Sequence, residues 1–403
     1  MTDLNIGLIG AGNISRTYFE MSPLFDGIRI VAVADLNPDA ASRAAQAHGV
    51  SAMSPEAMLA DPAIDLIVNL TIPDAHFAVS RAALLAGKHV YSEKPFVLSV
   101  AEGMELAAIA EARGLRLGSA PDTFLGSAHQ QARALVDAGE IGTVHSATAH
   151  VMSAGMEHWH PNPDFFFLPG GGPILDLGPY YIAALVNLLG PVASVTALTG
   201  MASETRLISS QPRAGERIPV RTPTTIHALL HFVSGAMVTL GASWDVHGHR
   251  HGNMEIYGSE ASLILPDPNF FGGPIEMSRR GQALAPVSSW QHPFGVANED
   301  SNGIARANYR GAGLADMVRA IRDGGDFRCD QSRALHVIEV MTAILAAGAD
   351  RKWIGLSTTC TRPKALDPAA AAQLMRSPAD SGPSPVGPDA AQADLSGASL
   401  GLT

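Results

Sequence analysis

The chain has 403 residues, enough for two or three domains, with a formal net charge of −11 and only 16% charged residues. An acidic chain without basic runs lacks the electrostatic footprint of a nucleic-acid-binding protein, and two cysteines, Cys329 and Cys360, are too few for a disulfide framework or a Cys-based zinc site. The N-terminus shows no secretory pattern, and no uninterrupted apolar run reaches the length of a membrane helix. We therefore expect a globular, cytoplasmic protein with no nucleic-acid or membrane partner.

Strand and helix patterns alternate over residues 1–122. Two almost wholly apolar runs, 28–34 and 66–70, are typical of strands that are buried on both faces. Strands that alternate with helices predict an α/β fold with a doubly wound parallel sheet, a Rossmann domain. The remaining strands are expected at 5–9, 89–92 and 115–119, and the helices at 14–21, 39–48, 76–86 and 101–113.

The pattern changes after residue 122. Longer strand-like stretches joined by short turns predict a second domain, residues 123–363, of α+β class with a large, mostly antiparallel open sheet. An open sheet with one uncovered face also favours a homodimer or homotetramer. Residues 364–403 are rich in Ala, Pro, Gly and Ser and are predicted to be a flexible tail. The strands of the second domain are expected at 143–152, 192–200, 224–233, 236–244, 253–257 and 261–265, followed by helices at 314–322 and 333–347.

A glycine-rich turn joins the first strand to the first helix. Gly10 allows the tight turn, and Gly12 lets a pyrophosphate approach the backbone. The first helical residues, Asn13 and Ile14, offer free N–H groups to the phosphates, and Ser15 is small enough for close packing of helix on strand. The turn therefore predicts a dinucleotide-binding site.

An acidic residue, Asp35, ends the second strand 23 residues after Gly12. A carboxylate at this place binds the ribose hydroxyls of the adenosine in NAD. It would repel the 2′-phosphate of NADP, and the nearest arginine is Arg43. NAD is therefore the expected cofactor. The alternative is that Asp35 caps the helix that begins near Pro38, because Asp is a good N-cap.

Two further segments carry recognisable motifs: 86–95, which reads AGKHVYSEKP, and 170–180, which reads GGGPILDLGPY. Together with the glycine-rich turn, they make residues 4 to about 363 resemble the glucose–fructose oxidoreductase/inositol dehydrogenase/rhizopine-catabolism (Gfo/Idh/MocA) family. The resemblance implies a Rossmann domain, a C-terminal open-sheet domain, and hydride transfer between a nicotinamide cofactor and a sugar or polyol.

The family's catalytic residues map onto Lys94, Asp176 and Tyr180. Many members carry a histidine at the position of Tyr180, whereas others, glucose–fructose oxidoreductase among them, carry a tyrosine. Oxidation of a secondary alcohol requires a group that takes the hydroxyl proton, and a lysine ammonium nearby favours tyrosinate and stabilises developing alkoxide. Whether Tyr180 or Asp176 is the base is left open. The expected cofactor-binding residues beyond the glycine-rich turn and Asp35 are Thr71, Pro73, His76, Glu93 and Lys94.

Two segments are expected to line the substrate pocket. Asp122 and Thr123 follow the last Rossmann strand, and Trp159 and His160 belong to a loop before the Gly-rich motif, where an aromatic platform and an imidazole suit a sugar beside Tyr180. The segment 245–251 contains three histidines at alternate positions, but glycines interrupt it and hydride transfer needs no metal, so no metal site is expected.

The sequence therefore predicts an NAD-dependent oxidoreductase acting on a secondary alcohol or ketone of a sugar, polyol or glycoside. Two alternatives stay open: a redox-neutral enzyme that retains its NAD and cleaves glycosides through transient oxidation, and a non-catalytic nucleotide-binding sensor. A net appearance of NADH separates the first interpretation from both.

Overall fold

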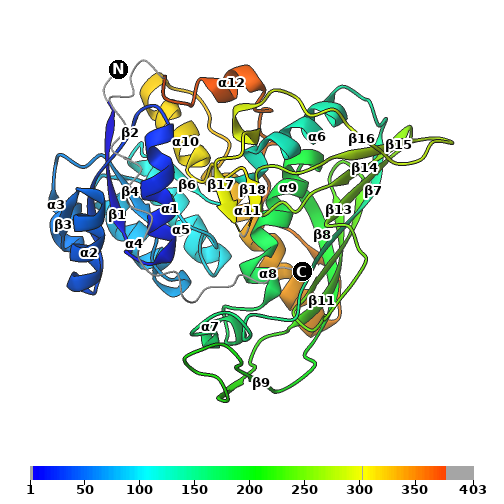
Figure 1. Ribbon diagram of the computed structural model, residues 1–403, viewed down its shortest axis with the longest axis horizontal. Helices are drawn as coiled ribbons and strands as arrows, with labels where there is room; N and C mark the ends of the chain where they lie inside the picture. The colour runs from blue at the N-terminus through cyan, green and yellow to red at the C-terminus, as the bar shows by residue number, and fades with distance from the viewer. Residues whose placement is uncertain (1–2, 302, 378–403) are drawn as a thin grey trace.

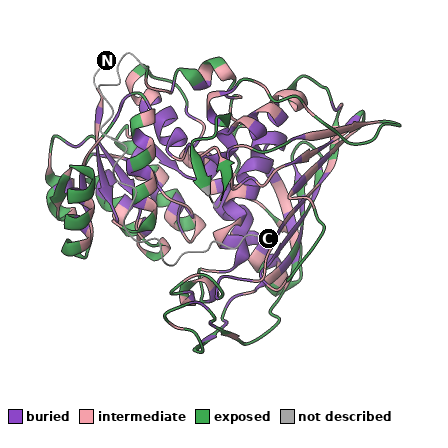
Figure 2. Cartoon of the chain, in the orientation of Figure 1, coloured by how far each residue is buried: buried purple, intermediate pink, exposed green. Residues whose placement is uncertain are grey.

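The computed structural model describes residues 3–301 and 303–377. Figure 1 shows a parallel sheet with its helices on one side of the molecule, a large twisted sheet on the other side, and α9 and α11 between them. Buried residues concentrate where these central helices meet the two sheets (Figure 2). The α/β class and the two kinds of sheet predicted from the sequence are confirmed.

The N-terminal sheet has six strands in the order β3-β2-β1-β4-β5-β6, and all its neighbours pair in parallel. The strand order reverses between β1 and β4, the position where doubly wound sheets bind ligands beyond the carboxyl ends of their strands. The strands are β1 (Leu4–Ile9), β2 (Ile28–Ala34), β3 (Ser51–Met53), β4 (Leu66–Asn69), β5 (His89–Ser92) and β6 (Leu117–Ser119). The helices are α1 (Asn13–Met21), α2 (Pro38–His48), α3 (Pro55–Ala60), α4 (Pro73–Leu85) and α5 (Val100–Ala112).

Local chemistry explains where these helices begin. Helix α2 has Asn37 as N-cap, whose side chain accepts the N–H of Asp39, and proline at its first position. Helix α5 begins with a capping box. The Ser99 side chain accepts the backbone N–H of Glu102, and the Glu102 side chain accepts the backbone N–H of Ser99. Since Asn37 caps α2, Asp35 is not the N-cap of that helix.

The C-terminal sheet has nine strands in the order β16-β15-β14-β13-β7-β12-β11-β8-β19. Only the β7–β12 pair is parallel, which confirms a mostly antiparallel open sheet. Its strands are β7 (Val144–Met152), β8 (Val192–Gly200), β11 (Thr225–Phe232), β12 (Met237–Ser243), β13 (Met254–Gly258), β14 (Ala261–Leu265), β15 (Glu276–Arg279), β16 (Ala285–Pro286) and β19 (Ile354–Gly355). Two small hairpins, β9 (Thr205–Leu207) with β10 (Arg217–Pro219) and β17 (Glu299–Ser301) with β18 (Ile304–Arg306), lie outside it.

Helices cover one face of this sheet. Helix α11 packs on β8 and against α9, and α6 packs on β14. In β11 the buried residues alternate with exposed ones, so Leu229 points away from these helices. By length and composition α11 is also apolar enough to cross a membrane, but half of its apolar window is buried inside the protein. The helices are α6 (Ser127–Asp137), α7 (Asp164–Phe167), α8 (Pro173–Asp176), α9 (Gly178–Leu189), α10 (Ala312–Asp323), α11 (Gln331–Asp350) and α12 (Pro368–Ala372).

The two sheets are joined by more than the chain connection at residue 122. The Cys329 carbonyl accepts the N–H of Ser119 at 3.0 Å, and Gly118 forms a β-bridge with Asp330. The segment before α11 therefore covers the free edge of β6.

The prediction of a flexible tail from residue 364 is wrong for residues 364–377. Leu366 and Leu374 are almost fully buried, and α12 lies between them. Beyond α12, Met375 forms a β-bridge with Phe25, and the N–H of Arg376 binds the Leu24 carbonyl at 2.9 Å. The remainder of the predicted tail, 378–403, lies outside the described residues.

Candidate active site

The glycine-rich turn after β1 fits a dinucleotide phosphate. Gly10 has φ +109°, and a Cβ there would lie 2.5 Å from the Leu70 carbonyl oxygen, so only glycine fits. A Cβ at Gly12 would meet nothing within 4 Å, which leaves open space above the turn. No side chain caps the N-terminus of α1, where Asn13 is exposed and Ile14 half-buried. Backbone N–H groups at this helix end are therefore available to a phosphate.

Asp35 lies at the tip of β2 beside this turn. Its carboxylate accepts the N–H groups of Ala11 and Asn37, both at 2.8 Å. The side chain is half-buried, whereas Leu36 next to it is 92% exposed and Arg43 is exposed. The structure thus places Asp35 at the edge of the dinucleotide site with no cation adjacent to it in sequence.

The segment after β4 is held by buried polar groups. The Thr71 hydroxyl donates to the Asn69 side chain at 2.7 Å, and Asn69 is fully buried. His76 is also buried, with its ring nitrogens 2.7 Å from the Pro95 carbonyl and 3.0 Å from the Thr71 carbonyl. Burial lowers the pKa of His76, although the two carbonyls oppose this shift, and the ring links the two loops. We assign His76 to loop positioning and not to direct cofactor contact, whereas Thr71 and Pro73 lie half-buried at the edge of the sheet.

Glu93 and Lys94 follow β5 and point in different directions. The Glu93 carboxylate accepts the Tyr18 hydroxyl and the Lys94 backbone N–H, both at 3.0 Å, so it fixes the backbone of this loop. The Lys94 ammonium donates to the Asp176 carboxylate and to the Asp176 carbonyl, both at 2.8 Å. The side chains of Lys94 and Asp176 are only 18% and 22% exposed.

The ion pair with Asp176 favours the protonated form of Lys94. Burial alone would lower the pKa of Lys94, but the charge and hydrogen bond of Asp176, together with Tyr180 and Glu93, outweigh burial and raise this pKa above its ordinary value. Lys94 is therefore a permanent cation at neutral pH and does not take up a proton. It can donate to an oxygen on which negative charge develops.

Tyr180 completes the group. Asp176 is the last residue of α8 and Tyr180 the third of α9, with Leu177 between the two short helices. The Lys94 ammonium lies 5.2 Å from the centre of the Tyr180 ring. The structure therefore brings together the three predicted catalytic residues from the loop after β5, the end of α8 and the first turn of α9.

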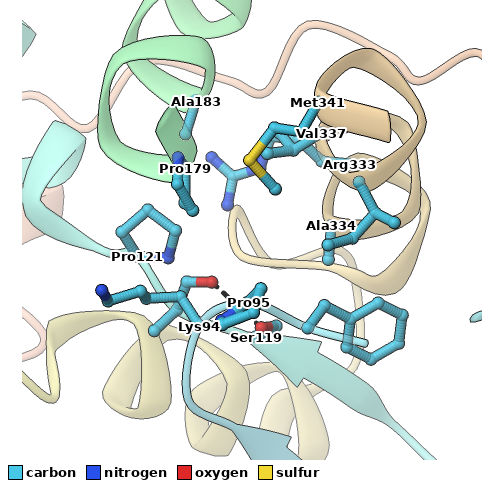
Figure 3. Close-up of a pocket in the computed structure, with 13 residues that line it drawn as sticks. Lys94, Pro95, Ser119, Pro121, Pro179, Ala183, Arg333, Ala334, Val337 and Met341 are labelled. Carbon is cyan, nitrogen blue, oxygen red and sulfur yellow. Dashed lines mark hydrogen bonds between the residues drawn. The ribbon is translucent and has the colours of Figure 1, made fainter. Parts of the chain in front are cut away.

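A small cavity is lined by Lys94 and Pro95 on one side (Figure 3). Its volume is about 10 Å³, room for roughly one water molecule, so it is not a sugar-binding pocket. Figure 3 shows Lys94 and Pro95 on one side of it and Arg333 and Met341 of α11 on the other.

Two predicted substrate ligands have structural roles instead. The Asp122 carboxylate is 3% exposed and accepts the N–H groups of Gly311 and Gly313 at 2.8 and 3.0 Å, at the start of α10. The Thr123 hydroxyl is buried and donates to the Pro268 carbonyl at 2.6 Å. Both face the protein interior, which sequence position alone did not indicate.

Trp159 and His160 lie nearer to the catalytic group. Burial lowers the pKa of His160, an effect that the nearby charge of Asp176 partly opposes, so the imidazole lies within electrostatic range of that carboxylate. The rings of Trp159 and His160 meet edge to face at 5.3 Å, and Trp159 is 37% exposed. Contact of these two residues with a substrate stays a prediction.

A buried ion cluster anchors this loop, and the sequence did not reveal it. Arg206 pairs with Glu157 at 2.9 Å and also with Asp245. The His160 carbonyl accepts the Ser210 hydroxyl at 2.6 Å. The hairpin of β9 and β10 thus holds the loop in place. Its members are far apart in sequence, so only the fold brings them together.

The histidines of segment 245–251 do not form a recognisable metal site. The ring of His251 stacks on that of His150 in β7, with 4.1 Å between the ring centres, and its centre lies 6.0 Å from that of the His249 ring. Within the part of the chain that the structure describes, no group of three or more His, Cys, Asp or Glu side chains could hold a metal ion.

Comparison with known proteins agrees with this geometry. Residues 4–120 match the model of an oxidoreductase family with an NAD-binding Rossmann fold, and residues 129–264 match the Gfo/Idh/MocA C-terminal domain. The chain belongs to the Gfo/Idh/MocA family. Residues 4–120 are thus an NAD-binding domain.

Relatives within the Gfo/Idh/MocA family span the chain to different extents. An uncharacterised oxidoreductase of Escherichia coli, YdgJ, is 30% identical over 199 residues, which are 48% of this chain and 56% of that protein. Levoglucosan dehydrogenase of Pseudarthrobacter phenanthrenivorans is 22% identical over 389 residues, 88% of this chain and 98% of that protein. A structure of levoglucosan dehydrogenase with NADH and L-sorbose covers 89% of this chain, with a TM-score of 0.75 and 21% identity, and shows that the fold is shared.

Proposed function

We propose that this protein is an NAD-dependent dehydrogenase or reductase that acts on a secondary alcohol or ketone of a sugar, polyol or glycoside. The observation that carries the proposal is the Lys94 ammonium, held 2.8 Å from Asp176 beside Tyr180 at the ligand-binding edge of a dinucleotide-binding sheet. A nucleotide sensor without turnover would have no need for this cation.

The residues present divide the chemistry of alcohol oxidation between them. Bound NAD supplies the hydride acceptor. The Gly10–Gly12 turn and Asp35 would hold its pyrophosphate and adenosine ribose. Lys94 would donate to the substrate oxygen and stabilise the developing alkoxide, and Asp176 keeps Lys94 in place. Tyr180 would take the hydroxyl proton, with Asp176 as the competing acceptor.

The proposed substrate class rests on the loop of Trp159 and His160. An aromatic face and an imidazole beside a charged group suit a ring that has both apolar C–H and polar hydroxyl surfaces. Similarity along most of the chain to a relative named levoglucosan dehydrogenase supports a sugar or sugar derivative.

A panel of sugars, polyols and glycosides, mixed with NAD and followed by the absorbance of NADH, tests this proposal. We expect at least one compound to reduce NAD, and Tyr180→Phe to slow that reaction much more than it weakens NAD binding. If Tyr180→Phe is as fast as wild type while Asp176→Asn is inactive, Asp176 or a water is the proton acceptor. Glycoside cleavage without net NADH would replace the proposal by the redox-neutral alternative.

Self-association through the open face of the nine-stranded sheet, as a homodimer or homotetramer, is part of the proposal. Leu198, Leu229 and Met237 are 68%, 49% and 62% exposed on neighbouring strands. Exposed apolar side chains on adjacent strands favour a protein–protein contact. A cytoplasmic location is also proposed, because Cys329 and Cys360 are both free thiols.

A further inference from the structure

Arg333, in the first turn of α11, is a buried cation that lacks a counterion inside the protein. Its side chain is 4% exposed. Its Nη1 atom is fully buried and has no hydrogen-bond partner among the described residues, and no carboxylate there forms an ion pair with the guanidinium. A charge in a protein interior is costly unless a partner compensates it, so this arginine requires an explanation.

Two other lysine or arginine side chains are buried to a similar degree within the described residues, and both have partners. The Lys88 ammonium donates to two backbone carbonyls at 2.6 and 2.7 Å. Arg133 pairs with Asp137 at 2.7 Å and donates to two backbone carbonyls, both at 2.9 Å. The fold thus supplies acceptors to these two buried cations and leaves Arg333 without them.

The acidic groups near Arg333 are committed to other partners. Asp330 caps α11, and its carboxylate accepts the backbone N–H of Arg333 at 2.9 Å and the hydroxyl of a neighbouring serine at 3.0 Å. Asp316 pairs with Arg328 at 2.6 Å. Cys329 supplies no negative charge at neutral pH, because burial raises the pKa of its thiol to about 12, although Arg333 opposes this shift.

The guanidinium adjoins the small cavity described above. It lies over the ring of Phe124, 3.9 Å from the ring centre. It also lines the cavity of about 10 Å³ that it shares with Lys94. Figure 3 shows the guanidinium pointing into this cavity, between Pro179 and Met341. An unpaired cation is therefore aimed at a space that holds one small species.

The lining of the cavity favours an anion over a water molecule. A buried water needs acceptors for its hydrogens as well as a donor. The lining side chains are apolar apart from Arg333, Lys94 and Ser119, and the Ser119 hydroxyl donates to a backbone carbonyl at 2.9 Å. The Pro95 carbonyl lies 2.7 Å from a ring nitrogen of His76. A monatomic anion needs donors only, and it also brings the negative charge that the guanidinium lacks.

We propose that this cavity is a binding site for a halide ion such as chloride, held by Arg333 Nη1. The ion neutralises the buried guanidinium and contacts the apolar side chains of Val337 and Met341 on α11. Since Lys94 and Pro95 form another wall of the cavity, the ion also joins the loop after β5 to α11. The inference is independent of the proposed function, because the site binds its ion whatever reaction the protein catalyses.

Thermal unfolding of the full-length protein in increasing sodium chloride tests this site, with sodium methanesulfonate replacing chloride at constant ionic strength. An ion that binds only the folded state stabilises it, so we expect chloride to raise the Tm of wild type by about 3 °C or more. Arg333→Gln should lose this shift. Arg133→Gln is the matched control, because it removes a buried arginine that has internal partners, and it should keep the shift. No shift in wild type, or an equal shift in Arg333→Gln, would overturn the inference.

Crystals of the wild-type protein soaked in sodium bromide give a second measurement, which needs no arginine variant to fold. Bromide scatters anomalously, and we expect a peak within hydrogen-bond distance of Arg333 Nη1. Ala183→Val fills the cavity from α9 and keeps the arginine, so it should remove the peak. Ala184→Val, at a buried position of the same helix outside the cavity lining, should retain it. An ordered water at Nη1 with no bromide peak in the wild-type cavity would contradict the halide site.

Discussion

The Asp35 carboxylate ends β2 with two backbone N–H groups as partners, and none of its neighbours in sequence is a cation that could bind a 2′-phosphate. We therefore predict that NAD binds at least ten-fold more tightly than NADP, a difference of about 1.4 kcal/mol or more. Asp35→Ser should weaken NAD binding and narrow this gap. Fluorescence titration with NAD and with NADP measures this difference in affinity. Equal affinities in the wild-type protein would contradict a role of Asp35 in cofactor selection.

Asp122 gives a second prediction for a single residue, this time on stability. Burial raises the pKa of Asp122 to about 6, although its two backbone N–H partners oppose the shift. An acid whose pKa is higher in the folded state binds its proton more readily there, so its contribution is complete below about pH 4 and is lost as pH rises through 6. The free energy of unfolding should fall over this range by roughly 3 kcal/mol relative to Asp122→Asn.

Denaturant unfolding at pH 4, 5 and 6 tests this slope in wild type and Asp122→Asn. The exposed Asp323→Asn variant is the control, because it removes a carboxylate from α10 without a buried partner. Parallel pH profiles for wild type and Asp122→Asn would show that the carboxyl group titrates as in the unfolded chain.

The segment that contains α12 illustrates what composition alone misses. Leu374 is 2% exposed, and its carbonyl accepts the N–H of Asp26 at 2.9 Å. Leu374→Ala should therefore lower the free energy of unfolding by about 2–5 kcal/mol. Gln373→Ala, at an exposed neighbouring position, should have little effect. If both variants unfold at the same denaturant concentration, the packing of this segment contributes nothing to stability.

Periodicity predicted most elements because it reports burial directly. The apolar run at 66–70 is a fully buried strand, and alternation in 224–233 marks β11, buried on one face only. The prediction for 364–377 is wrong because the composition of this segment is dominated by small residues and proline. Its packing depends on a few buried apolar side chains, Leu366 and Leu374 among them. Helix α6 was not predicted from its polar sequence, and its buried Gln130 and Arg133 find partners only in the folded chain.

The candidate site also contains residues that local motifs predict and residues that only the fold reveals. The glycine-rich turn, Asp35, Lys94, Asp176 and Tyr180 stand in local motifs, and the structure brings the last three together. The Arg206 ion cluster is built from tertiary contacts between distant segments, so no local sequence pattern predicts it. The expected roles of Asp122 and Thr123 came from chain order alone, which does not say whether a side chain faces a pocket or the core.

For the molecule as a whole, the uncovered face of the nine-stranded sheet carries the prediction on assembly. Leu229→Glu would place a charge on the strand between those of Leu198 and Met237 and should shift an oligomer toward monomer in sedimentation velocity. Met104→Glu, at a residue of α5 that is 58% exposed away from this sheet, is the matched control. A wild-type protein that sediments as a monomer at high concentration would contradict self-association through this face.

The most direct test of the whole account is the turnover number of Lys94→Ala on a sugar that the wild-type protein oxidises, followed by NADH absorbance. We predict a loss of about 10²–10⁴-fold in kcat, because the variant lacks the cation that stabilises the alkoxide and favours tyrosinate. NAD affinity should change much less, since the glycine-rich turn and Asp35 remain, and the exposed Lys352→Ala should match wild type. A folded Lys94→Ala enzyme that turns over at the wild-type rate would contradict the proposed mechanism.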